Sequence, residues 1–267
     1  MTDRPADLPD YRDPPIDEVV ISVQFPPIEG FFDTHAGLYW QRVRQDYPRS
    51  ESQPRMEGPI ETAEPGQLIP MSLQLTPGQG RVWLISADDD FLIQVQNTRF
   101  IQNWRRRQGE YQHFEQLSNL FWANYTKFLE FLTEEGLTKP AVQQVEVSYV
   151  NWIPEQATDF LRPASVAAVS VLGSNGYPDQ QSWIARYSLE SDRGLIQRLY
   201  VQSLPASRKD APNVSGTQFA LTYRAARADG IELSELSELI GSARITIVTA
   251  FTDLTTEDAH QRWGRFQ

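Results

Sequence analysis

The sequence contains no cysteine, which excludes disulfide bonds, thiolate nucleophiles and every metal site built from cysteine ligands. Histidine is also scarce, because His35, His113 and His260 are widely separated and none lies in an HExxH motif. The chain has no Walker loop, no GxGxxG motif and no GxSxG motif. We therefore expect no metal ion and no cofactor, and we identify no catalytic residue. Catalytic groups can be assembled from distant parts of a chain, so these absences favour a protein without enzymatic activity but leave an unfamiliar enzyme open.

Long apolar runs are missing as well. No run approaches the roughly 18 residues that a helix needs to cross a bilayer. Residues 1–15 are polar, acidic and rich in proline, unlike a signal peptide with its basic start and apolar centre. With 40% hydrophobic and 22% charged residues, the composition is typical of a globular protein. These features predict a soluble, cytoplasmic protein with no membrane contact.

Positive charge is in short supply. The formal net charge is -11, and residues 1–66 carry 13 acidic against 6 basic side chains. Phosphate binding needs a local excess of cations, so this balance argues against general affinity for nucleic acid. The acidity is compatible with a partner protein and also with simple solubility. We expect another protein as the partner, with nucleic acid as a less favoured option and the oligomeric state undetermined.

Hydrophobic periodicity predicts both strands and helices. In residues 16–25, Val19, Ile21 and Val23 occupy alternate positions, which predicts a strand, and prolines stand at both ends. Asp88–Asp90 predicts a hairpin turn rather than a cation site, because consecutive carboxylates point in different directions. The strongest helical pattern covers residues 111–135, where apolar residues recur every three or four positions: Phe114, Leu117, Phe121, Tyr125, Phe128 and Leu132.

Weaker patterns complete the expected order of elements. Helices are expected over residues 33–47 and from residue 232, and shorter ones near 154–161 and from Thr255, where Thr255 and Asp258 form a capping-box pattern. Residues 48–67 and 97–110 are expected to be connecting segments without regular structure. Further strands are expected at residues 68–75, 81–87, 90–96, 141–153, 165–172, 181–190, 195–204 and 216–226.

This order predicts an α+β protein with two similar halves, each an antiparallel sheet packed against one long helix, of the saddle-like or helix-grip type. Each half would begin with a strand and a helical segment, continue with a run of strands and end in a long helix. Residues 1–140 would form the N-terminal half and residues 141–267 the C-terminal half, together in one compact unit.

A cluster of arginines contrasts with the acidity of the chain, and Trp104 lies within it. No acidic residue occurs between Phe91 and Gly109, and four arginines fall within nine residues: Arg99, Arg105, Arg106 and Arg107. In a first interpretation these arginines are solvated or pair with the acidic N-terminal quarter. In a second they bind an anionic ligand or acidic partner with help from Trp104, and in a third they form one wall of a nucleic-acid groove. We favour the first interpretation, in which they also order Glu146 and Asn151.

A second polar stretch, VEVSYVNW, lies within the strand predicted at residues 141–153. Tyr149 and Asn151 share one face of this strand, and Glu146 lies on the other. A glutamate and an asparagine inside a central strand need polar partners. The stretch therefore predicts either a structural hydrogen-bond network or part of a ligand site.

Several stretches occur in an order that covers nearly the whole chain: PPIDE at 14–18, RFIQNWRR at 99–106, VEVSYVNWI at 145–153 and WGR at 263–265. Together they resemble a sporadically distributed bacterial family of about this length. The resemblance implies no activity, because the family has none assigned, and its patchy occurrence implies a link to mobile or defence-related genes. The positions that it marks here are Pro15, Glu18, Arg99, Asn103, Trp104, Arg105, Glu146, Tyr149, Asn151 and Trp263.

Three functional hypotheses follow. The leading one is a non-enzymatic interaction or regulatory protein, linked by the resemblance to a mobile defence or toxin–antitoxin type of system. The second is a ligand- or nucleic-acid-binding module that uses the arginines, and the third is an enzyme of unrecognised type built around Glu146, Tyr149 and Asn151. The candidate binding residues are Arg99, Asn103, Trp104, Arg105, Arg106, Arg107, Glu146, Tyr149 and Asn151.

Overall fold

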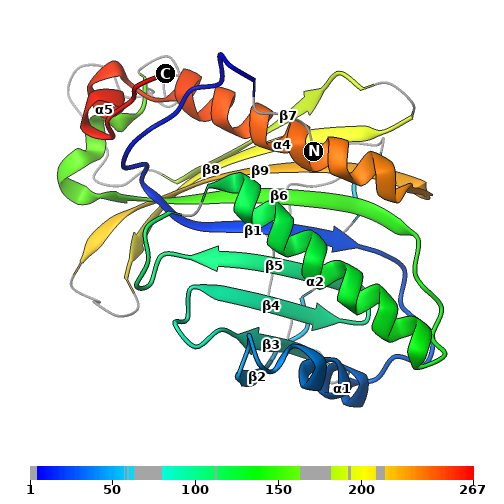
Figure 1. Cartoon of the computed structure of the whole chain (residues 1–267). Coiled ribbons are helices and arrows are strands. Elements are labelled where there is room, and N and C mark those ends of the chain that lie inside the picture. The colour runs from blue at the N-terminus through cyan, green and yellow to red at the C-terminus, as the bar shows by residue number, and fades with distance from the viewer. Residues whose placement is uncertain are drawn as a thin grey trace.

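The computed structural model contains one continuous antiparallel sheet with helices packed against it (Figure 1). It describes residues 5–56, 58, 60–62, 80–111, 113–162, 182–191, 194–208 and 214–267. Nine strands pair in the order β2-β3-β4-β5-β1-β6-β9-β8-β7. Their bounds are β1 Ile16–Gln24, β2 Arg49–Gln53, β3 Arg81–Ile85, β4 Phe91–Gln96, β5 Arg99–Arg105, β6 Val142–Pro154, β7 Trp183–Leu189, β8 Ile196–Ser207 and β9 Ser215–Ile231.

The helices of the described residues follow the predicted periodicity. The long helix α2 ends at Glu134, and Gly136 terminates it with a φ of 71° and an N–H that donates to the carbonyl oxygen of Thr133. None of these helices is long and apolar enough to cross a membrane. The bounds are α1 Asp33–Val43, α2 Phe114–Glu134, a 3₁₀ helix η1 Glu155–Phe160, α4 Leu233–Leu254 and α5 Glu257–Arg262.

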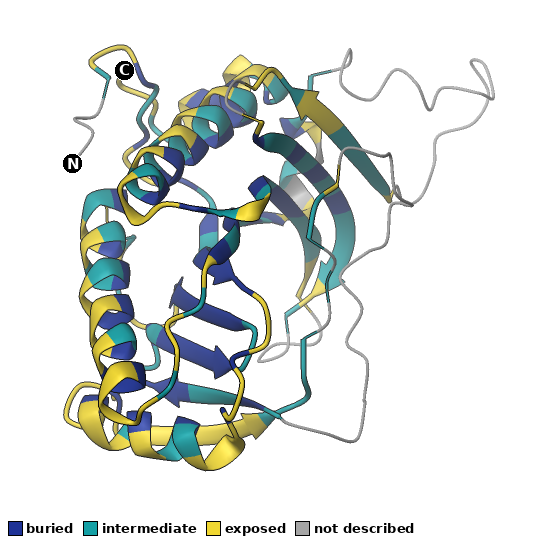
Figure 2. Ribbon diagram, turned by 90° about the vertical axis from the view of Figure 1, so that its right-hand side faces the viewer, coloured by how far each residue is buried: buried dark blue, intermediate teal, exposed yellow. Residues whose placement is uncertain are grey.

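Helices α1, α2 and α4 cover the same face of the sheet, which we call the helix face (Figure 2). Side chains alternate along each strand, so one set from every strand points into this layer. Val23 of β1, Phe100 of β5 and Val145 of β6 are 0% exposed there. Their neighbours in sequence point to the opposite face, which carries mainly polar side chains.

Aromatic rings form the contact between α2 and the sheet. Phe128 of α2 is 0% exposed, and its ring centroid lies 5.2 Å from that of Phe100 and 5.4 Å from that of Tyr39 on α1. Such ring pairs add to the free energy gained from burying apolar area. The predicted face of residues 111–135 is therefore the face that closes the core.

The expectation of two similar halves, each with its own sheet and one long helix, is wrong. Strand β1 pairs with β5 on one side and with β6 on the other, so hydrogen bonding continues across the proposed boundary at residue 140. The result is a single nine-stranded sheet. Strand and helix order along the chain does not specify which strands become neighbours, and this is why the sequence pattern misled us.

Local assignments also need correction. Residues 49–53 form β2 and residues 99–105 form β5, although both segments were expected to connect other elements. The last helix is capped by the side chain of Thr256, which accepts from the N–H of Ala259, and not by Thr255. The strands expected at residues 68–75 and 165–172 lie outside the described residues.

The packing of α2 predicts a large effect of Phe128→Ala. Removing a fully buried phenylalanine leaves a cavity, and we expect the free energy of unfolding to fall by about 3–5 kcal/mol. The exposed neighbour Thr126 provides a control, because Thr126→Ala should leave stability unchanged or slightly higher. Urea denaturation of both variants measures the difference. Similar midpoints for the two variants would contradict the assigned core.

Candidate functional site

The face of the sheet opposite the helices, called here the polar face, is lined with amides and charges that are nevertheless buried. Side chains of this kind are stable in a protein interior only when they have hydrogen-bond partners. Strand alternation brings them to one side from β1, β4, β5 and β6. Those with 9% exposure or less are Gln24, Gln94, Gln96, Arg99, Asn103, Arg105, Gln144 and Glu146.

The described residues of the segment 54–62, which are 54–56, 58 and 60–62 and are called here the strap, supply many of these partners with their main chain. Gln96 accepts from the N–H of Met56 at 3.1 Å and donates its Nε2 to the carbonyl oxygen of the same residue at 3.0 Å. Gln24 and Arg99 both donate to the carbonyl oxygen of Gly58 at 3.0 Å. The sheet therefore holds the strap through backbone atoms, from strands that are distant in sequence.

The strap continues over β6, β9 and β8. Gln144 accepts from the N–H of Glu61 at 2.8 Å. The carboxylate of Glu61 accepts from the hydroxyl of Tyr200 at 2.6 Å and from Nη1 of Arg224 at 3.1 Å. Nε of Arg224 donates to Glu146 at 2.5 Å, so two carboxylates share one guanidinium.

Arg224 is positioned to stay charged in this site. Its side chain is 17% exposed, and its guanidinium lies 4.8 Å from the centre of the Tyr200 ring. Desolvation lowers the pKa of Arg224, but the charges and hydrogen bonds of Glu146 and Glu61 outweigh it and raise that pKa. A permanent cation therefore lies at the centre of this part of the polar face.

A second network runs across β3, β4, β5 and β1. Arg81 donates to Gln94 at 2.6 Å, Gln94 donates to Asn103 at 2.7 Å, and Asn103 donates to Glu18 at 2.7 Å. The amide dipoles are thus aligned from a guanidinium to a carboxylate, which strengthens each bond in the series. Desolvation raises the pKa of Glu18, although the Asn103 hydrogen bond and the charges of Arg105 and Arg107 lower it.

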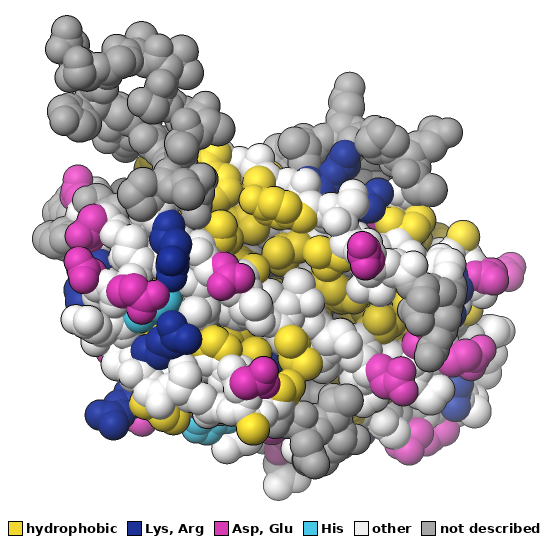
Figure 3. Space-filling view, turned by 90° about the horizontal axis from the view of Figure 1, so that it is seen from above, with side chains coloured by type: hydrophobic (Ala, Val, Ile, Leu, Met, Phe, Trp, Pro, Cys, Tyr) yellow, Lys and Arg dark blue, Asp and Glu magenta, His cyan; other side chains and the backbone are white. Residues whose placement is uncertain are grey.

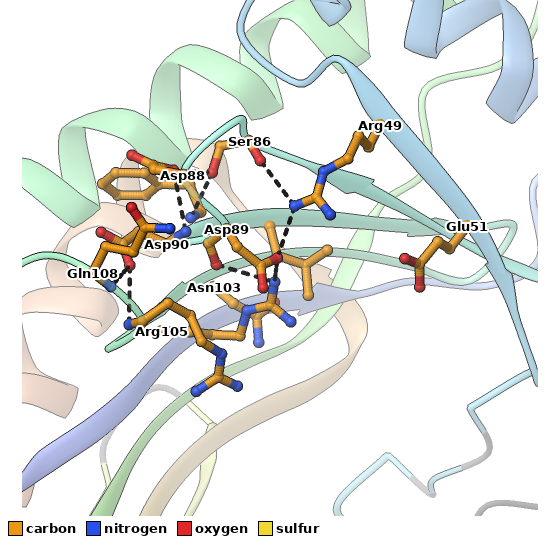
Figure 4. A network of polar contacts seen from close by, with 12 residues as sticks. Arg49, Glu51, Ser86, Asp88, Asp89, Asp90, Asn103, Arg105 and Gln108 are labelled. Atoms are coloured by element: carbon orange, nitrogen blue, oxygen red, sulfur yellow. Dashed lines mark hydrogen bonds and ion pairs between the residues drawn. The ribbon is translucent and has the colours of Figure 1, made fainter. Parts of the chain in front are cut away.

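Asp88–Asp90 forms the predicted turn between β3 and β4, and Arg105 anchors it (Figure 4). Arg105 donates to the carboxylate of Asp89 at 2.6 Å and to its carbonyl oxygen at 3.1 Å, and Arg49 donates to the same carboxylate. Asp90 accepts from the backbone N–H groups of Arg107 and Gln108, both at 3.0 Å. The turn carboxylates thus bind the chain itself. The described residues contain no group of three or more acidic or histidine side chains suited to a metal ion.

The clustered arginines have separate roles within the chain. Arg99 holds the strap and Arg105 holds the turn, as described above. Arg106 donates to the carbonyl oxygen of Pro14 at 3.0 Å and lies 3.4 Å from the carboxylate of Asp13. Glu146 pairs with Arg224, so the expectation that the cluster orders Glu146 does not describe the structure.

Trp104, Tyr149 and Asn151 lie on the helix face, apart from Glu146. The hydroxyls of Tyr149 and Tyr111 are 3.5 Å apart, and burial raises the pKa of Tyr149 well above its ordinary value. Asn151 donates to the carbonyl oxygen of Phe219 at 2.9 Å. The candidate residues are therefore divided between two faces, and Glu146, Tyr149 and Asn151 do not share one site.

A small cavity lies beside Tyr149 and Asn151, beneath the N-terminal segment. Tyr11 in that segment forms a β-bridge with Arg265, and its ring and hydroxyl contact Phe251 and Thr252 of α4. The cavity volume is about 50 Å³, enough for a few water molecules. Among its lining residues are Tyr11, Ile16, Tyr111, Tyr149, Asn151 and Arg244.

The described residues form no basic stripe on the face that Figure 3 shows, which is the molecule of Figure 1 seen from above. Basic and acidic side chains are interspersed there, with hydrophobic side chains between them (Figure 3). Nucleic-acid binding needs clustered cations that are free to meet phosphates. Arg99, Arg105 and Arg106 are instead engaged within the chain, as their contacts show.

Sequence reasoning missed the residues that hold the strap. Gln24, Gln96 and Gln144 each lie within a predicted strand, on the side opposite its apolar set. That alternation was a usable signal for a polar face. Nothing local pointed to Glu61, Tyr200 or Arg224, whose contacts join segments far apart in the chain.

No protein-family model matches the chain, and no curated protein matches it.

The raised pKa of Glu18 predicts a pH-dependent effect of Glu18→Gln. The folded pKa is above the ordinary 4.5, so protonation of Glu18 favours the folded state. That stabilisation is complete below pH 4.5 and is lost as the pH rises through the folded value. The glutamine can still accept from Asn103 and never ionises. The melting temperature of Glu18→Gln should therefore exceed that of the unmodified protein by an amount that grows as the pH rises above 4.5 and levels off once the pH has passed the folded pKa of Glu18.

Differential scanning fluorimetry between pH 4 and pH 8 measures this difference. Glu130→Gln serves as the control for loss of one carboxylate, because Glu130 is exposed on α2. If the difference in melting temperature between Glu18→Gln and the unmodified protein stayed constant with pH, the ionised form of Glu18 would not be destabilised by its surroundings.

Proposed function

We propose that this protein is a non-catalytic interaction protein that binds an extended polypeptide segment of a partner across the polar face. The observation that supports this proposal most directly is the strap. Gln96, Arg99 and Gln144 of the sheet bind its backbone at Met56, Gly58 and Glu61. A surface that binds one extended chain in this way has the chemistry to bind another.

Recognition through the backbone requires little of the ligand's sequence. The Gln96 amide binds both the N–H and the carbonyl of Met56, much as a neighbouring strand would. Every residue other than proline presents the same two groups. The proposed partner is therefore defined first by an extended conformation, and side chains add selectivity.

The composition of the polar face also favours exchange of its occupant. The helix face is closed by apolar burial, at about 25 cal/mol for each Å² that leaves water. Each hydrogen bond to the strap adds only about 0.5–1.5 kcal/mol, because water can replace the strap as a partner. The strap thus separates from the sheet at a much lower cost in free energy than α2 or α4.

An internal occupant gives the protein a means of regulation. The strap competes with any partner for the same hydrogen-bonding groups. The apparent affinity for the partner is therefore the intrinsic affinity multiplied by the fraction of molecules whose polar face is open. A change that weakens the strap raises that fraction. This coupling is what distinguishes a regulated interaction protein from a simple peptide-binding surface.

A peptide binding experiment on the full-length chain tests the proposal. The probe is a fluorescent peptide with the sequence of residues 54–62, PRMEGPIET. Met56→Pro in the protein removes the N–H that Gln96 binds and so weakens the strap. We expect this variant to bind the peptide about tenfold more tightly than the unmodified protein does, which corresponds to about 1.4 kcal/mol.

Met56→Ala is the matched control, because it changes the side chain but keeps the N–H group. We expect its affinity for the peptide to match that of the unmodified protein, measured by fluorescence anisotropy. Failure of the folded Met56→Pro variant to bind any of the peptide would refute the proposal.

A further inference from the structure

The end of the strap occupies a site built for a negative charge. Glu61 has a side chain only 9% exposed, and its carboxylate accepts from Tyr200 and Arg224. Hydrogen bonds to charged groups of this kind contribute more than neutral ones, about 1.5–3 kcal/mol each. The strap is therefore held here by a side chain as well as by its backbone.

Glu61 is one of the two carboxylates that bind Arg224. Strand pairing brings Arg186 opposite Tyr200, and Arg198 opposite Arg224, all on the polar face. Glu146 is the carboxylate on the sheet that bonds to Arg224. Without Glu61, Arg224 keeps Glu146 as its carboxylate partner, and the hydrogen bonds that Tyr200 and Nη1 of Arg224 donate to Glu61 lose their acceptor. An incoming carboxylate restores both hydrogen bonds.

We propose that Arg224 and Tyr200 form a carboxylate-binding pocket that selects an acidic side chain in the partner's extended segment, with Glu61 as its internal substitute. This inference rests on the proposed function and adds the chemistry of the partner to it. Gln144 fixes the position of the acidic residue by binding its backbone N–H. The acidic side chain then lies three positions after the residue whose carbonyl Gln24 and Arg99 bind.

The contacts favour an acidic side chain over a chain terminus or a phosphate. The strap continues beyond Glu61, with Nη2 of Arg198 at 3.5 Å from the carbonyl oxygen of Thr62. A terminal carboxylate would end the chain where the structure carries it onward. A phosphate brings close to two negative charges, and it would meet Glu146 across the same guanidinium. A single carboxylate matches the charge that the site accepts.

Peptide variants test the pocket in a full-length protein that carries Met56→Pro and Glu61→Gln. The first change weakens the strap and the second removes its own carboxylate, so the strap no longer competes for the pocket. Three peptides are compared: PRMEGPIET, the same peptide with glutamine in place of Glu61, and one in which Glu61 and Thr62 are exchanged. The exchanged peptide keeps the composition and net charge, but successive side chains of an extended chain point in opposite directions.

We expect the glutamine peptide and the exchanged peptide to bind at least tenfold more weakly than the parent. Adding Tyr200→Phe to the protein should weaken the parent peptide about tenfold and the glutamine peptide less, because the hydroxyl bonds more strongly to a carboxylate than to an amide oxygen. Equal binding of all three peptides would overturn the carboxylate pocket and leave the proposed function standing. Binding of none of them to the folded protein would overturn both.

Hydrogen exchange gives an independent test in a chain with a single replacement. The amide of residue 61 is bonded to Gln144, so its exchange rate reports how often the strap opens. We expect Glu61→Gln to accelerate that exchange at least fivefold, whereas Glu51→Gln, at an exposed site on β2, should not. An unchanged rate in Glu61→Gln would show that the pocket does not hold the strap and would overturn the inference.

Discussion

The pairing of β1 with both β5 and β6 is the constraint on which the rest of the structure depends. It joins strands from the two ends of the chain into one sheet, and it determines the register of everything attached to them. Opposite Val19, for example, lie Trp104 on one side and Tyr149 on the other. A shift of one residue would turn the buried side chains of Val19, Ile21 and Val23 to the polar face.

This register gives the sheet two faces that are closed by different kinds of interaction. Aromatic and aliphatic side chains close the helix face, where they are buried away from water. Glutamines, arginines and glutamates close the polar face, where the strap supplies partners that water or another chain can also supply. Apolar contacts therefore close one side of the sheet, and hydrogen bonds and ion pairs close the other.

Electrostatics within the chain explains the arginines of an acidic protein. The strap, the turn at Asp88–Asp90 and the N-terminal segment each take one guanidinium from the stretch that begins with Arg99. Arg224, outside that stretch, sits between Glu61 and Glu146. In each case a guanidinium binds an oxygen atom of a segment that is distant in the sequence.

The sequence by itself determined the elements whose signal is local. The 3.6-residue period of α2, the alternation of β1 and the turn at Asp88–Asp90 all follow from neighbouring side chains, and the structure confirms them. Only the tertiary structure decided that residues 99–105 form a strand, that the sheet is single, and that the strap lies across it. These features depend on contacts between distant positions, such as Gln96 with Met56 and Arg224 with Glu61. Local periodicity does not reveal such contacts, because they depend on which strands become neighbours in the sheet.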